Sequence, residues 1–174
     1  FGITTVPADK VVSPELKQAG HKLYLIKHNA LANYMPNVEQ LKENWTYTTN
    51  AIQSGKVCAT YALGFGGVAE AIAKMSFGNE LAVDIQIAEN ELFDYNYGSI
   101  LVEATEDLSL PAAQYIGTVI EGTHLVINGE QVSREVLLHA CCGQFDKIYP
   151  SAVPAQHQTL MPAETLPLTS NLSP

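Results

Sequence analysis

Apolar residues follow two kinds of pattern along the chain. Strand-length runs, either continuous or alternating with polar residues, predict strands at residues 22–27, 57–63, 81–87, 99–105, 115–120 and 124–127. Apolar residues spaced three and four apart predict helices after Asn37, Gly67 and Ser133. The acidic stretch at residues 88–96 predicts a short helix or a loop. The pattern therefore indicates one chain that contains both strands and helices.

Capping residues support the first predicted helix. Asn37 is placed to cap it, because Gln40 follows at the capping-box distance, and Gly55 is placed to end it. The residues expected on its buried face are Val38, Leu41, Trp45, Thr48 and Ile52.

Turn signals predict how the later strands connect. Residues 121–123 predict a tight turn that would join the strands at 115–120 and 124–127 into a hairpin. Asn128 and Gly129 predict a second tight turn directly afterwards.

The stretch from Val57 to Asn79 predicts a strand, a glycine turn and a helix. Gly64, Gly66 and Gly67 lack a Cβ atom, so an anion such as phosphate could approach the N–H groups that the first helical turn leaves unpaired. The same glycines would also allow a sharp turn with the helix packed close to its strand, and both interpretations stay open here. The spacing does not fit the dinucleotide fingerprint, because no acidic residue ends a second strand about 20 residues later.

Length and charge restrict the possible functions. With 174 residues, 47% of them hydrophobic, the chain can bury one sizeable core, and we expect one domain with a tail. The formal net charge is -9, and no Lys or Arg occurs between Met75 and Ser133. Because nucleic-acid binding needs clustered cations, no nucleic-acid partner is expected. The acidic surface is either solvated or docks on a basic neighbour.

The cysteines indicate a cellular compartment rather than a reaction. Three cysteines without framework spacing favour a reduced, cytoplasmic environment. No apolar run approaches the roughly 18 residues of a membrane span, and no signal peptide is evident, so no membrane partner is expected. Cys141 and Cys142 lack a Gly-x-Cys-x-Gly elbow and an ordered His and carboxylate. We interpret them as buried structural thiols rather than as a nucleophile or metal pair.

The remaining titratable residues give no clear site. His21 and His28 flank the first predicted strand, and no Cys or carboxylate follows at metal-ligand spacing, so we expect both at the surface. Asp84 and Glu103 lie on predicted strands and could act as general acid and base or hold Mg²⁺. Exposed strand-face carboxylates are far commoner, so we predict neither a catalytic residue nor a metal ligand.

The chain is expected to have three parts. Residues 1–12 predict an extended leading segment, residues 13–150 a folded domain, and residues 151–174 a Pro-rich linker or disordered tail. Five of the nine prolines fall from Pro150 onward. Because the first residue is not Met, we interpret the chain as a piece of a longer polypeptide.

Five segments occur in a specific order: Val12-Ser-Pro-Glu-Leu16, Gly20-His-Lys-Leu-Tyr-Leu-Ile26, Gly64-Phe-Gly-Gly-Val-Ala-Glu-Ala-Ile-Ala-Lys-Met-Ser-Phe-Gly78, Ile116-Gly-Thr-Val119 and Phe145-Asp-Lys-Ile-Tyr-Pro150. In this order they resemble the C-terminal domain of the aminoimidazole-ribonucleotide-synthetase superfamily, and within it most closely the phosphoribosylformylglycinamidine synthase family. The ordered series, not the glycines alone, makes the resemblance specific.

The resemblance implies an α/β (α+β) domain with a mixed sheet flanked by helices. It implies part of an ATP-dependent carbon–nitrogen ligase of de novo purine biosynthesis. In that enzyme ATP activates the amide oxygen of formylglycinamide ribonucleotide, and ammonia from a separate glutaminase domain displaces it. An N-terminal ATP-binding lobe and that glutaminase domain would be the partners, with ATP and Mg²⁺ as cofactors of the intact enzyme, and the isolated fragment would be inactive.

The resemblance also implies a site. Gly64, Phe65, Gly66 and Gly67 would face the cleft as nucleotide- or phosphate-binding residues. Many long-form relatives read Asp-x-Ser-Asp-Gly-Gly here, whereas this chain has Ala62, Gly64 and Phe65 at the first three specified positions. Metal ligation by the loop is therefore not expected.

Two alternatives to this function stay open. The chain could belong to another branch of the superfamily, such as aminoimidazole ribonucleotide synthetase, selenophosphate synthetase or a hydrogenase-maturation factor. It could also be a structural module whose loop only packs against partner lobes.

Overall fold

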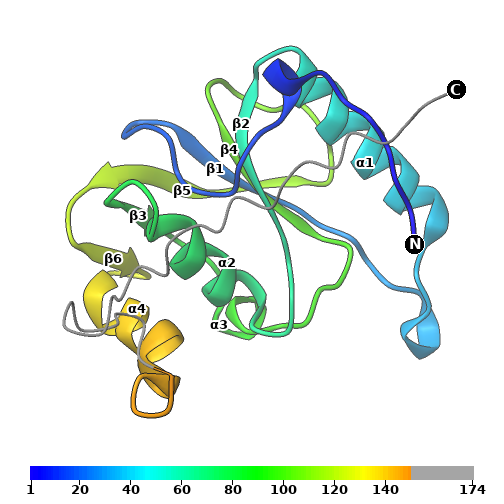
Figure 1. Ribbon diagram of the computed structural model, residues 1–174. Helices are drawn as coiled ribbons and strands as arrows, with labels where there is room; N and C mark the ends of the chain where they lie inside the picture. Colours follow the sequence, from blue (N-terminus) through cyan, green and yellow to red (C-terminus); the bar gives the residue numbers. More distant parts are fainter. Residues whose placement is uncertain (150–174) are drawn as a thin grey trace, which may run out of the picture.

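A single mixed sheet forms the centre of the computed structural model, which describes residues 1–149 (Figure 1). Its strand order is β2-β4-β1-β5-β3-β6-β7, and every pairing is antiparallel except that of β3 with β6. The strands are β1 (Lys22–Ile26), β2 (Val57–Ala62), β3 (Leu81–Ile85), β4 (Ile100–Ala104), β5 (Ala113–Glu121), β6 (His124–Ile127) and β7 (Glu130–Ser133). The expected mixed sheet is confirmed.

Helices flank this sheet, as the resemblance implied (Figure 1). The α-helices are α1 (Val38–Gln53), α2 (Gly67–Ser76), α3 (Glu89–Leu92) and α4 (Arg134–Cys142). Short 3₁₀ turns lie at Ala8–Lys10, Ala32–Tyr34 and Gly143–Phe145. The expected fold class, an α/β arrangement, is therefore confirmed.

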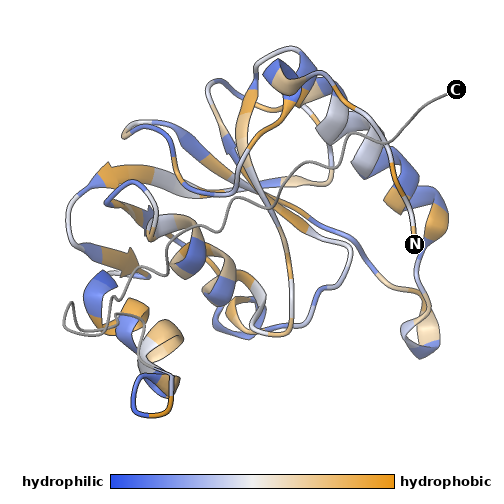
Figure 2. Cartoon of the chain, viewed as in Figure 1, coloured by the Kyte–Doolittle hydropathy of each residue, from blue (hydrophilic) through white to orange (hydrophobic). Residues whose placement is uncertain are grey.

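The central strand β1 is buried on both faces, which explains its continuous apolar run. Leu23 and Leu25 belong to the core between the sheet and α2, whereas Tyr24 and Ile26 belong to the core on the α1 side. Successive side chains of a strand point to opposite faces, so this one strand contributes to both layers. Figure 2 shows the hydrophobic residues that follow the strands across the middle of the sheet.

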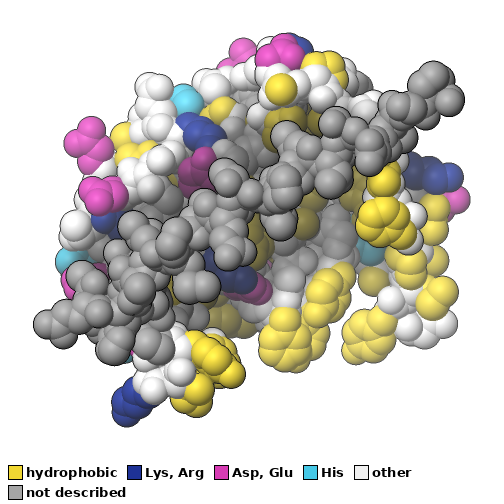
Figure 3. All heavy atoms as spheres, viewed as in Figure 1, with side chains coloured by type: hydrophobic (Ala, Val, Ile, Leu, Met, Phe, Trp, Pro, Cys, Tyr) yellow, Lys and Arg dark blue, Asp and Glu magenta, His cyan; other side chains and the backbone are white. Residues whose placement is uncertain are grey.

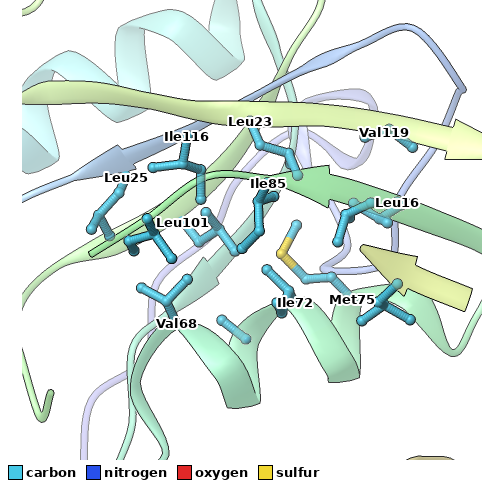
Figure 4. Packing of buried hydrophobic residues seen from close by; sticks show 14 of the residues in the cluster. Leu16, Leu23, Leu25, Val68, Ile72, Met75, Ile85, Leu101, Ile116 and Val119 are labelled. Carbon is cyan, nitrogen blue, oxygen red and sulfur yellow. The ribbon is translucent and has the colours of Figure 1, made fainter. Parts of the chain in front are cut away.

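Helix α2 buries the face that its sequence predicts. Val68, Ile72 and Met75 are each no more than 1% exposed and point toward the strands (Figure 4). Full burial of side chains of this size contributes about 1.5–3 kcal/mol each. This packing fixes the start of α2 against the sheet and so fixes the loop before it.

Helix α1 begins where the sequence predicts, but its buried face matches the predicted one only in part. Asn37 Oδ1 accepts the Gln40 N–H at 3.2 Å, which confirms the predicted cap. Trp45 is 51% exposed, so its predicted burial is wrong. Thr48 is buried as predicted, and Asn44 is buried as well; both side chains donate to backbone carbonyls. These bonds lower the cost of burying the two polar side chains, whereas the buried Asn44 Oδ1 has no hydrogen-bond partner among the described residues.

The hairpin predicted around residues 121–123 is wrong. Strand β5 pairs with β1 and β3, and β6 pairs with β3 and β7, so β3 lies between β5 and β6. The hairpin forms one turn later, where Asn128 and Gly129 have φ of 51° and 87° and connect β6 to β7. Patterns of apolar residues predict the strands but not which neighbour each strand pairs with.

The predicted linker or tail at residues 151–174 lies outside the described residues. Within residues 1–149, none of the helices has both the length and the hydropathy that crossing a bilayer requires.

Candidate functional site

The predicted strand, glycine loop and helix form one continuous unit. β2 ends at Ala62 and α2 begins at Gly67, with Gly66 as its N-cap. Gly67 has φ of +63°, and a Cβ there would lie 2.7 Å from the carbonyl oxygen of Asp94. Because an L side chain is disfavoured at this φ and has no space, only glycine fits well at the start of α2.

The N-terminus of α2 is capped by a side chain of the same helix. The Gly66 N–H donates to Glu70 Oε2 at 2.9 Å. The other carboxylate oxygen, Oε1, accepts from Lys74 Nζ at 2.5 Å and from the Tyr61 hydroxyl at 3.4 Å. The Lys74 ammonium, followed by the Gly66 N–H, lowers the pKa of Glu70 below its usual value. An anionic group thus already occupies this helix terminus.

The glycines of the loop differ in how tightly they are packed. A Cβ at Gly66 would lie 2.6 Å from the Cβ of Glu70, which cannot move without the helix. A Cβ at Gly64 would meet only the far end of the same side chain, Glu70 Oε2, at 3.2 Å. Gly66 and Gly67 therefore have steric reasons to be glycine. Gly64 is the loop glycine that would best tolerate a side chain.

An exposed row of aromatic rings begins in this loop. Phe65 is 74% exposed and stacks on Tyr95, with 5.1 Å between ring centroids. Tyr95 in turn stacks on Tyr97 at 6.5 Å. Large hydrophobic side chains project from the lower edge of the face in Figure 3. We call Phe65, Tyr95 and Tyr97 the aromatic row.

A cavity of about 550 Å³ adjoins the aromatic row. His28, Tyr34 and residues 94–97 form most of its wall, so Tyr95 and Tyr97 belong to both features. The cavity is large enough for a small organic ligand, and its wall combines three tyrosine rings with a few polar side chains, which is typical of such sites. The glycine loop, the row and the cavity thus follow one another along one side of the protein.

His28 lies at this cavity, and its predicted surface position is wrong because it is only 4% exposed. Its Nδ1 lies 2.7 Å from the Tyr97 carbonyl oxygen, and its Nε2 lies 3.0 Å from the Asn37 backbone N–H. Since a carbonyl only accepts and an N–H only donates, Nδ1 carries the proton and Nε2 accepts. Both ring nitrogens are engaged, so His28 shapes the cavity wall rather than offering a ligand atom.

A second cluster was missed by the sequence analysis. Glu103, expected as an exposed carboxylate, is fully buried on β4. Its Oε1 lies 2.6 Å from His21 Nδ1, and it also accepts the backbone N–H groups of Lys17 and Gln18. His21 lies only partly at the surface, where the sequence predicted a surface residue, since its side chain is 18% exposed. The His21 ring and the two backbone N–H groups together offset the desolvation cost of burying the Glu103 carboxylate.

Cys58 completes this cluster from β2. Its Sγ lies 3.5 Å from His21 Nδ1. The register of β2 against β4 shifts between Val57 and Ala59, and such irregularities re-aim a side chain. Burial, followed by the charge of Glu103, raises the pKa of the Cys58 thiol to about 12. No spacing rule finds this group, because the sheet order β2-β4-β1 alone brings the three residues together.

Other predicted residues do not form sites. Cys141 and Cys142 are both exposed, so their interpretation as buried thiols is wrong: α4 carries no buried residue. Asp84 is exposed on β3, as expected. Strands β1 and β5 lie between β3 and β4, so Asp84 and Glu103 do not form an acid–base pair.

The arrangement has the fold of a synthetase-type α/β domain, and solved structures identify the likeness. PurLQS from Thermotoga maritima superposes with a TM-score of 0.65 at 14% identity, covering 76% of this chain and 28% of that one. PurL of the same organism complexed with ATP superposes with a TM-score of 0.59 at 13% identity, with the same coverage of both chains. HypE from Escherichia coli, a hydrogenase maturation protein, superposes with a TM-score of 0.52 at 13% identity, covering 70% of this chain and 51% of that one.

This chain and these solved structures are similar in fold. This chain spans about 28% of the length of the PurL chains that it matches. No protein-family model and no curated protein matches the sequence. The expected fold is thus confirmed by structure, whereas activity has to be argued from the site.

Proposed function

We propose that the chain is a C-terminal-type domain of a phosphoribosylformylglycinamidine synthase. This ligase uses ATP and glutamine to convert formylglycinamide ribonucleotide to formylglycinamidine ribonucleotide. The observation that carries the proposal is the glycine loop that leads from β2 into the N-terminus of the 10-residue helix α2, within the fold of PurL chains. In this proposal, main-chain N–H groups of residues 64–67 contact the phosphates of the nucleotide.

The capping carboxylate supports an anion site. Glu70 Oε2 sits 2.9 Å from the Gly66 nitrogen, so this terminus already holds one negatively charged oxygen. Helix N-termini attract anions through unpaired N–H groups and the helix dipole. Phosphate binding would require the Glu70 side chain to move aside, which its 26% exposure permits. Lys74, released from Glu70, would then provide a cation next to the loop.

The proposal assigns no Mg²⁺ site to this loop. Ala62, Gly64 and Phe65 offer no side-chain oxygen, and Mg²⁺ requires oxygen ligands. The Glu70 carboxylate, which contacts the loop, is held by Lys74 and the Gly66 N–H. In the intact enzyme, the N-terminal lobe would therefore supply the metal ligands, and a glutaminase domain would supply ammonia.

A structural module is the second candidate, and the loop itself favours it. Gly66 and Gly67 have steric reasons to be glycine, and Glu70 satisfies the N–H that a phosphate would need. In this alternative the loop packs against partner lobes and binds no nucleotide.

Amide chemical-shift mapping separates the two candidates. A non-hydrolysable ATP analogue is titrated into the isotope-labelled chain, with adenosine as the control that lacks phosphates. The proposal predicts shifts at the amides of residues 64–67 with the analogue only. Shifts confined to other regions, or none, would favour the structural module. Formylglycinamide ribonucleotide is titrated in parallel, because its binding distinguishes the purine-pathway ligase from the hydrogenase-maturation branch.

The matched variant for this experiment is Gly64→Ala. Its methyl group enters the loop but meets only the mobile end of Glu70, so the fold should persist while phosphate contact weakens. Gly66→Ala is unsuitable, because its Cβ would collide with the Glu70 Cβ whether or not a ligand binds. Retained analogue binding by folded Gly64→Ala would contradict close phosphate contact at this position.

A further inference from the structure

Three side chains, one from the residue just before β1 and the others from strands β2 and β4, bring metal-binding atoms close together. His21 Nδ1, Cys58 Sγ and a Glu103 carboxylate oxygen all lie within 4.8 Å of one another. Cys58 lies near the start of β2, whereas the glycine loop follows the end of that strand. The cluster is therefore separate from the proposed phosphate site, and nothing in the proposed function uses it.

The distances are close to those of a tetrahedral metal site. For zinc bonded to sulfur and nitrogen at their usual lengths, the two ligand atoms lie about 3.5 Å apart. The Cys58 Sγ to His21 Nδ1 distance is 3.5 Å. The nitrogen–oxygen edge would be about 3.3 Å, whereas His21 Nδ1 and Glu103 Oε1 are 2.6 Å apart because a proton joins them. Replacing this proton by a metal would require these two atoms to move apart by about 0.7 Å.

The donor set selects the kind of metal. Thiolate and imidazole together suit Zn²⁺ and similar borderline cations, whereas Mg²⁺ and Ca²⁺ prefer oxygen ligands alone. The Cys58 thiolate and the buried Glu103 carboxylate would repel each other, since both would carry a negative charge and their ligand atoms lie within 4.8 Å. A bound dication removes that repulsion and allows the thiolate to form.

The geometry does not suit a catalytic triad. In a triad, the nucleophile and the carboxylate contact opposite nitrogens of the imidazole ring. Here Cys58 Sγ and Glu103 Oε1 both approach His21 Nδ1, so the ring cannot pass a proton from one to the other. Nucleophilic catalysis by Cys58 is therefore not supported.

We propose that His21, Cys58 and Glu103 bind one Zn²⁺ ion, or a similar borderline divalent cation. Cys58 loses its thiol proton on binding, and His21 keeps one ring proton, now on Nε2, so that Nδ1 can bind the metal. Glu103 remains a carboxylate, and its Oε2 keeps the Lys17 N–H bond of 2.8 Å. Water occupies the fourth position, which the partly exposed His21 side leaves open. The ion would tie the segment before β1 to β2 and β4.

Cobalt spectroscopy tests this proposal without reference to enzymatic activity. The exposed Cys141 and Cys142 are first replaced in a Cys141→Ser/Cys142→Ser variant, because they could bind metal themselves. Co²⁺ added to this variant should give a thiolate-to-cobalt charge-transfer band and the intense d–d bands of a four-coordinate site, with one ion per chain. Zn²⁺ should displace the cobalt and remove the bands.

The decisive comparison adds Cys58→Ser to the same background. The charge-transfer band should be lost, and the rise in melting temperature that Zn²⁺ produces in the double variant should disappear. Circular dichroism shows whether each variant is folded. A folded double variant without the band would overturn the proposal, and so would a band that persists after Cys58→Ser.

Discussion

The Glu70 carboxylate accepts the Gly66 N–H at 2.9 Å and so caps the helix to which it belongs. In the same position, an anionic ligand of a glycine loop would be expected. Because of this contact, the Gly66 N–H has an acceptor even without a ligand. A phosphate bound at the loop would have to compete with the Glu70 carboxylate for this N–H.

Removing the charge of Glu70 should change the acid stability of the chain. Its folded-state pKa lies below the usual value, so its stabilising contribution is complete above the unfolded pKa of about 4.5 and is lost as the pH falls through the folded value. Glu70→Gln should therefore lower the melting temperature near neutral pH, and the difference from wild type should shrink as the pH falls below about 4. A difference independent of pH would contradict the assigned ion pair with Lys74. The measurement is thermal unfolding at a series of pH values.

Alanine at Gly67 should destabilise the fold, whereas alanine at Gly64 should not. Gly67→Ala imposes a left-handed conformation on an L residue and places a Cβ 2.7 Å from the Asp94 carbonyl oxygen, so we expect a loss of at least about 1–3 kcal/mol. Gly64→Ala should change the unfolding free energy by less than about 0.5 kcal/mol. Urea denaturation of both variants checks this, and equal losses would contradict the different roles of the two glycines.

The sequence predicts local structure here far better than long-range placement. The α2 face of Val68, Ile72 and Met75 follows from helical spacing alone, because neighbouring turns decide it. The burial of Glu103 could not be foreseen, since its donors Lys17 and Gln18 lie 86 and 85 positions away along the chain. Any rule based on residue type places a strand carboxylate at the surface.

In the candidate site, too, the sequence predicts the local structure but not the contacts between distant residues. The apolar run before the glycines and the helical spacing after them predict a strand-to-helix loop, and the structure contains it. The capping bond from Gly66 to Glu70 needs side-chain geometry, because Glu70 is one position beyond the usual capping box. The stack of Phe65 on Tyr95 depends on residues 92–94 packing against Gly67, which the sequence does not reveal.

Truncating Glu103 should be among the most costly single changes. Glu103→Ala leaves the Lys17 and Gln18 N–H groups and His21 without their acceptor, and breaking a buried pair typically costs about 3–5 kcal/mol. Glu121→Ala is the matched control, because Glu121 is an exposed strand glutamate and should change stability by less than about 0.5 kcal/mol. Both are measured by urea denaturation with a chelator present. Similar values for the two variants would contradict the buried network.

Removing the α1 cap should have a smaller effect. Asn37→Ala loses the bond from the Gln40 N–H to Asn37 Oδ1 and should cost about 1 kcal/mol. Asn50→Ala serves as the control, because Asn50 is exposed within the helix and alanine has the higher helix propensity, so this change should be neutral or slightly stabilising. Denaturation midpoints of the two variants give the comparison. An Asn37→Ala variant as stable as wild type would show that the cap contributes nothing.

Calorimetric titration of a non-hydrolysable ATP analogue into wild-type chain and into Glu70→Gln tests the central claim most directly. If the loop amides hold nucleotide phosphate, Glu70→Gln should bind the analogue more tightly than wild type, because the competing carboxylate charge is gone and Lys74 is free to pair with phosphate. Adenosine should show no such gain. Equal affinity of the two proteins for the analogue, or no binding by either, would contradict the account.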